Sequence, residues 1–219
     1  MVLIKEIAAL LQKDILIEWR QKFAIGGILL YVVSTVFVIY ISFIRVQPQV
    51  WNVLYWIIML FASVNAVAKS FVQENGNRQL YYYQLANPTA MIIAKIIYNI
   101  LLLLLLNILT FIVFGFVAGN PVRDFSQFGA AILLSSIGFG ITFTFVSGIA
   151  AKANNSATLM AILSFPVVLP ILLQLIKLSA NALGLITDTS IGKDIMILVG
   201  IDLIMITLTF VLFPYLWRD

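Results

Sequence analysis

Cysteine and histidine are both absent from this chain of 219 residues. Without cysteine there are no disulfides, iron–sulfur clusters, thiolate metal sites or cysteine nucleophiles. Without histidine the chain lacks the usual zinc ligand, the usual general base and the commonest axial ligand of haem iron. Much metal and hydrolase chemistry is therefore excluded.

Charge is also scarce, because charged residues make up 10% of the chain and apolar residues 63%. Soluble globular proteins have about 25% charged and roughly 45–50% apolar residues. The 13 basic and 9 acidic residues are bunched between long uncharged stretches, and the mean hydropathy is +1.09. The sequence therefore predicts an all-α integral membrane protein. Its net charge of +4 is first a topology signal, and we expect no nucleic-acid partner.

Apolar residues divide the chain into one amphipathic segment and six longer runs. In residues 1–22 they recur at helical spacing opposite charged residues, which predicts a helix lying in the membrane interface. The runs that follow predict six transmembrane helices within a single domain, 1–219. Their expected bounds are about 23–44, 50–67, 88–117, 128–150, 158–176 and 195–216.

Local signals refine three of these spans. Asn87 is a good N-cap and Pro88 suits the first helical position, so the third span has a clear start. Small residues fill 128–150, which predicts a buried helix closely approached by its neighbours. Pro166 and Pro170 predict a kink or break in the fifth span.

The distribution of Lys and Arg predicts the orientation. With alternating sides, nine of these residues lie on the side of both termini and four on the other side. Cytoplasmic loops collect positive charge, so both termini are expected in the cytoplasm. Trp19, Trp51 and Trp217 lie at span ends, as in an aromatic belt.

Few residues are candidates for a binding site or for a role in a transport pathway. No phosphate-binding loop is present, because Gly192-Lys193-Asp194 lacks the preceding glycine and the following Ser or Thr. Asp202 is the one acidic residue well inside a span, where it is costly and should face the bundle interior. It has either a pathway or partner role or a structural role. Lys95, expected in the headgroup region or cytoplasm, and Asn107 are further pathway candidates, although such asparagines more often join helices.

The loop after the second span has an unusual composition, with Glu74 and Arg78 beside apolar and aromatic residues that include Leu80, Tyr82 and Leu85. It predicts a short helix within 76–87. This helix either rests on lipid as a connector or docks on a soluble partner.

In this layout the chain resembles the permeases of type-2 ABC exporters, and within them the haem exporter protein B (CcmB) family of cytochrome c maturation. The residues that carry the resemblance are Lys13-Asp14 with Glu18 and Arg20, Phe71 and Glu74, Leu85 and Pro88, Lys95, and Phe165 to Pro170 in the fifth span.

The resemblance implies a non-catalytic permease of the bacterial cytoplasmic (inner) membrane. Its expected partners are a separate CcmA-like ATPase, CcmC-like and CcmD-like membrane proteins, a periplasmic CcmE-like haem chaperone and a second copy of this chain. ATP would bind the ATPase, haem would be the substrate of the complex, and this chain would bind no cofactor. Residues Glu74, Arg78, Leu80, Tyr82, Leu85 and Pro88 would couple it to the ATPase.

Other functions stay open at this point. A type-2 exporter of lipid, polysaccharide or drug would have the same layout. An integral-membrane enzyme such as a lipid transferase would need clustered carboxylates or histidines, and a secondary transporter would be expected to carry several intramembrane charges. The sequence has neither pattern.

Overall fold

The computed structural model describes residues 2–20, 22–43, 45–68, 87–151, 156–186 and 191–218. These residues are helical apart from short connections, and none of them is in a strand. The helices are α1 (Val2–Arg20), α2 (Lys22–Ser42), α3 (Pro48–Val67), α6 (Pro88–Ala118), α7 (Phe125–Ala150), α8 (Ser156–Ala182) and α9 (Ile191–Arg218).

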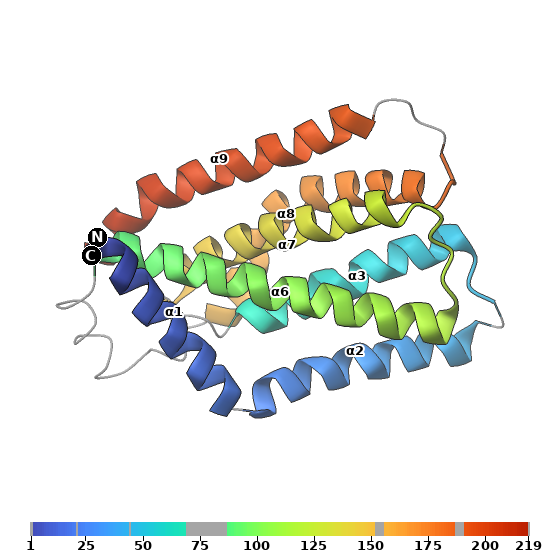
Figure 1. Cartoon of the computed structure of the whole chain (residues 1–219), viewed down its shortest axis with the longest axis horizontal. Coiled ribbons are helices and arrows are strands. Elements are labelled where there is room, and N and C mark those ends of the chain that lie inside the picture. Colours follow the sequence, from blue (N-terminus) through green and yellow to red (C-terminus); the bar gives the residue numbers. More distant parts are fainter. Residues whose placement is uncertain are drawn as a thin grey trace.

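Six of these helices lie side by side as a bundle, and α1 lies inclined at one end (Figure 1). Helices α2, α6 and α8 run in one direction along the bundle, whereas α3, α7 and α9 run in the other. The start of α1, the end of α9, the end of α3 and the start of α6 therefore share one end of the bundle.

Five helices are long and apolar enough to cross a membrane, namely α3, α6, α7, α8 and α9. In α2 the stretch Gly26–Ser42 is a shorter apolar helix. Large apolar side chains point outwards from the bundle, for example Leu30, Phe116 and Met196, which are 69%, 90% and 75% exposed. An apolar outer surface suits a lipid environment, and the chain is an all-α membrane protein.

Helix α7 lies at the centre, packed against α3, α6, α8 and α9. It is the most buried of the five candidate spans, as its small residues predicted. A Cβ atom added to Gly140 would lie 3.2 Å from the Cα of Ile100, so α6 and α7 are in close contact there. The helix begins at Phe125, three residues before the predicted start, because Asp124 accepts hydrogen bonds from the N–H groups of Ser126 and Gln127 at 2.9 and 3.0 Å.

The sequence predicted a kink or a break in the fifth span, and the structure excludes the break. Helix α8 passes through Pro166 and Pro170 without interruption and continues six residues beyond the predicted end, to Ala182. Each proline removes one backbone hydrogen bond. Buried apolar contacts of Val168, Ile171 and Leu175 hold the helix in place on both sides of Pro170.

An aromatic cluster fills the end of the bundle opposite the chain ends. Trp51 stacks on Tyr55 and Phe114 with ring centroids 5.4 and 5.0 Å apart, and Phe128 packs beside them. Trp51 is fully buried, so its predicted place in an interfacial belt is wrong. The reason is that α6 and α7 extend over the start of α3. The side chains of Trp19 and Trp217 lie outside the described part of the structure.

Candidate functional site

The clearest polar site lies where α1 meets the start of α6. Asn87 is the N-cap of α6, and its side-chain oxygen accepts a hydrogen bond from the Thr89 N–H at 3.0 Å, as predicted. The backbone N–H of Asn87 donates to Glu6 Oε1 of α1 at 2.7 Å. The first turn of α6 is therefore bonded to α1.

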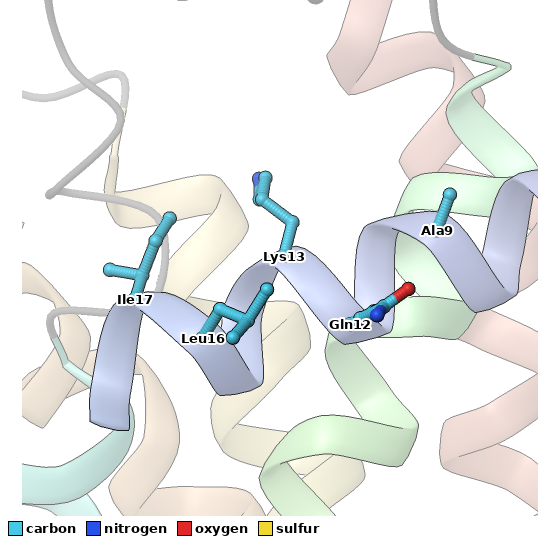
Figure 2. A pocket seen from close by; sticks show the side chains of 5 residues that line it. All are labelled: Ala9, Gln12, Lys13, Leu16 and Ile17. Atoms are coloured by element: carbon cyan, nitrogen blue, oxygen red, sulfur yellow. The ribbon is translucent and has the colours of Figure 1, made fainter. Parts of the chain in front are cut away.

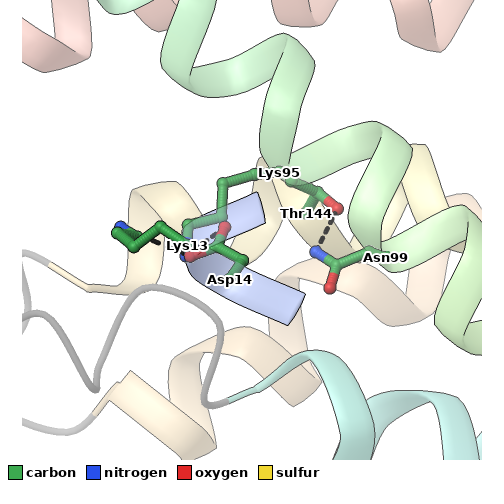
Figure 3. A network of polar contacts seen from close by, with 5 residues as sticks. All are labelled: Lys13, Asp14, Lys95, Asn99 and Thr144. Atoms are coloured by element: carbon green, nitrogen blue, oxygen red, sulfur yellow. Dashed lines mark hydrogen bonds and ion pairs between the residues drawn. The ribbon is translucent and has the colours of Figure 1, made fainter. Parts of the chain in front are cut away.

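A buried ion pair joins the same two helices further along. Lys95 Nζ of α6 lies 3.2 Å from Asp14 Oδ2 of α1, and both side chains are only 7% exposed. Lys13 Nζ lies 3.3 Å from the other carboxylate oxygen of Asp14 (Figure 3). Lys95 was expected among headgroups or in the cytoplasm, but α1 covers it, so its side chain is buried instead of solvated.

One turn further into the bundle, Asn99 connects α6 to α7. Its amide nitrogen donates to Thr144 Oγ1 at 2.8 Å, and the Thr144 hydroxyl donates to the Gly140 carbonyl within α7 (Figure 3). The ion pair and this amide contact thus follow one another along α6. They link α1, α6 and α7 at the end of the bundle where the chain ends lie.

A shallow, open groove of about 450 Å³ runs along α1, lined by Ala9, Gln12, Lys13, Leu16 and Ile17 (Figure 2). Gln12 and Leu16 are each two residues from Asp14, which places them on the opposite side of a helix with 3.6 residues per turn. The groove therefore faces away from α6. It is open along one side of α1 and does not enclose a substrate.

Asn107 lies deeper in α6 at the centre of a second network. Its amide nitrogen donates to the hydroxyls of Ser135 and Ser136 at 3.2 and 2.9 Å, and the Tyr55 hydroxyl donates to its side-chain oxygen at 3.2 Å. All four side chains are buried. Asn107 therefore joins α3, α6 and α7, which is the helix-joining role that is more usual for such residues.

Asp202 faces the bundle interior, as expected, and is 5% exposed. A Cβ atom added to Gly138 of α7 would lie 2.7 Å from Asp202 Oδ1 and 3.4 Å from the Ile171 side chain of α8. Asp202 of α9 therefore packs against Gly138 of α7, at a point where Ile171 of α8 is also close. Within the described residues its Oδ1 atom has no hydrogen-bond partner.

The sequence candidates do not form one site. Lys95 and Asn107 are twelve residues apart on α6, about 18 Å along a helix, and Asp202 lies on α9. In the described part of the chain, no three acidic side chains lie close enough together to hold a metal ion. Pro88 occupies the first position of α6 as predicted. Glu74, Arg78, Leu80, Tyr82 and Leu85 lie outside the described residues.

The residues that sequence reasoning missed are the acidic partners on α1. The sequence predicts only that the charged residues of 1–22, Glu6 among them, form the polar face of an interfacial helix, and it does not pair Asp14 with Lys95. A signal was available, since Glu6 and Asp14 are eight residues apart, as are Asn87 and Lys95. Equal spacing on two helices permits two simultaneous contacts, but the sequence does not say that the helices meet.

Comparison with known proteins decides the family. A model of the family described as CcmB protein matches residues 5–215, nearly the whole chain. The chain belongs to the CcmB family. It is accordingly a multi-pass membrane subunit of the haem-export ABC transporter of cytochrome c biogenesis, a permease that is generally non-catalytic. Searches of the curated proteins and of the solved structures gave no match.

Proposed function

We propose that this CcmB-family chain couples ATP hydrolysis by a separate CcmA-like ATPase to haem delivery, or release of the haem chaperone, on the outer side of the bacterial inner membrane. The family match over residues 5–215 carries this proposal. The contacts between α1 and α6 support it. They hold the start of α6 against α1, so a motion that enters at the start of α6 acts on both helices.

The proposal includes a six-span topology with both termini and the segment from Lys69 to Lys95, which ends in the first turns of α6, on the cytoplasmic side. The count of nine basic residues against four supports this orientation. The fold is consistent with it, since both chain ends lie at the same end of the bundle as the end of α3 and the start of α6 (Figure 1). Helix α2 would be the first span.

In the proposed mechanism the loop between α3 and α6 receives the ATPase. Leu80, Tyr82 and Leu85 would fill a groove on it, with Glu74 and Arg78 at the rim setting orientation. The loop leads directly into Asn87 and Pro88, the capped start of α6. Since α6 has 31 residues, about 46 Å at ~1.5 Å per residue, it carries the motion across the whole membrane.

Haem binding is assigned to other subunits in this proposal. The chain has no histidine or cysteine, so it lacks the strong axial ligands that haem iron usually takes. A CcmC-like protein with a small CcmD-like protein would handle haem in the membrane, and a CcmE-like chaperone would receive it outside. Two copies of this chain would surround the pathway with two ATPase subunits.

Affinity purification of the tagged chain from native membranes in mild detergent tests the proposal. A soluble ATPase and a haem-binding membrane protein should copurify with it. Recovery of an ATPase with no haem-handling protein, together with normal cytochrome c levels in a deletion strain, would indicate an exporter of another substrate.

A further inference from the structure

Helix α1 is attached to α6 at two points with matched spacing. Glu6 bonds Asn87 and Asp14 pairs with Lys95, and both steps cover eight residues, or about 12 Å of helix. A single contact would leave α1 able to pivot. Although α1 is inclined to the bundle (Figure 1), two contacts restrict both its sliding and its rotation on α6.

The second attachment is buried. The Asp14 and Lys95 side chains are each 7% exposed, so their charges interact where water screens them little. Breaking a buried pair by removing one partner is in general strongly unfavourable. Lys13 stays beside Asp14 when Lys95 is removed, so Asp14 is the partner whose loss has the larger effect. The arrangement therefore favours the state in which α1 stays on α6.

Chain connectivity extends this attachment to α2. Helix α1 ends at Arg20 and α2 begins at Lys22, so one residue separates them. Among the described helices α1 packs mainly on α6 and only slightly on α2. Its far side, which carries Lys5, Gln12 and Leu16, is exposed. The position of α1 thus depends on α6. Helix α2 is held both by its own packing on α6 and by its connection to α1.

We propose that Glu6 and Asp14 are positioning residues that clamp α1 to the first three turns of α6, so that α1 and the start of α2 move with α6 when the ATPase acts. This inference rests on the proposed function. It adds a second route for the motion, from α6 through the Lys95–Asp14 pair into α1 and α2, beside the direct route along α6.

A distance measurement tests the clamp in the full chain. Because the chain has no cysteine, Ala9→Cys on α1 and Ile97→Cys on α6 supply two unique sites for spin labels. In nanodiscs their distance distribution should be narrow and should not change between the ATP-bound and nucleotide-free states of the complex. Asp14→Leu should broaden it. Asp14→Lys combined with Lys95→Asp should restore it when Lys13→Gln also removes the positive charge beside position 14.

Coupling supplies the functional readout. The yield of cytochrome c per ATP hydrolysed should fall in Asp14→Leu, while the ATPase rate remains, and should recover in the charge-exchanged variant. Lys5→Gln, a change of charge on the exposed side of α1, is the matched control and should leave the yield unchanged. If Asp14→Leu does not fold, Asp14→Asn removes the charge with little change in shape.

An unchanged distance distribution in Asp14→Leu and Asp14→Asn would overturn the clamp. A distance between the labels at positions 9 and 97 that changes with nucleotide, with Asp14 and Lys95 both intact, would also overturn it. Failure of the proposed function has a different signature. In that case no ATPase copurifies with the chain, whereas the distance measurement on the chain alone still reports whether α1 is held on α6.

Discussion

Gly138→Ala tests the contact between α7 and Asp202 of α9. The added Cβ atom would lie 2.7 Å from Asp202 Oδ1, closer than any ordinary contact of a Cβ atom, and in contact with Ile171 at 3.4 Å. Asp202 is 5% exposed, so its carboxylate has little room to move away. We expect α7 and α9 to be forced apart or the Asp202 side chain to change its conformation.

The magnitude follows from two opposing terms. Replacing glycine by alanine inside a helix gains about 1 kcal/mol, and overpacking a well-packed core costs about 1–3 kcal/mol. Gly129→Ala in the same helix is the matched control, because its Cβ atom would meet nothing within 4 Å and only the gain applies. The two variants should therefore differ by about 1–3 kcal/mol, or roughly 2–12 °C in Tm for a chain of this size.

Thermal unfolding of the purified chain in detergent, followed by tryptophan fluorescence, measures this difference. The buried Trp51 and Trp56 report loss of the native packing. In an Asp202→Ala background the clash is absent, and Gly138→Ala should then cost nothing. Asp202→Asn keeps the size of the side chain and should keep the cost. Equal Tm values for Gly138→Ala and Gly129→Ala, or a cost that persists with Asp202→Ala, would refute the proposed contact.

Four further predictions follow from the same structure. Asn107→Leu should lower stability by about 1–2 kcal/mol, because it breaks contacts among three helices, and a normal Tm would show that this network is dispensable. Asp202→Leu should insert normally but impair cytochrome c maturation if the residue has a pathway or partner role, with Asp202→Asn as the milder control; an unchanged yield would assign it a structural role. Replacing Leu80, Tyr82 and Leu85 together by Ala should uncouple the ATPase, since each buried anchor is typically worth about 1–4 kcal/mol, and this is checked by copurification, the ATPase rate and cytochrome c yield. Wild-type values for all three would mean that the loop rests on lipid. A reporter that is active only outside the membrane, fused to the C-terminus, should be silent, and activity would overturn the six-span topology.

Much of the fold was predictable from the sequence, because helices in a membrane protein depend on local features. Long apolar runs must satisfy their backbone groups internally, so each run becomes a helix whatever lies beside it. The start of α6 at Pro88 was predictable because its cap is also local: Asn87 accepts a hydrogen bond from Thr89, which is two residues away. The order of motifs along the chain also carried the resemblance to the CcmB family.

The partners of the polar residues were decided by tertiary structure alone. Asp14 and Lys95 are 81 residues apart, and only the docking of α1 on α6 makes them a buried pair. The packing of α6 against α3 buries Trp51, which its place at a span end did not reveal. The packing of α9 against α7 brings Asp202 against Gly138. Local sequence determines that a helix forms, whereas the face it turns to its neighbours depends on how whole helices pack.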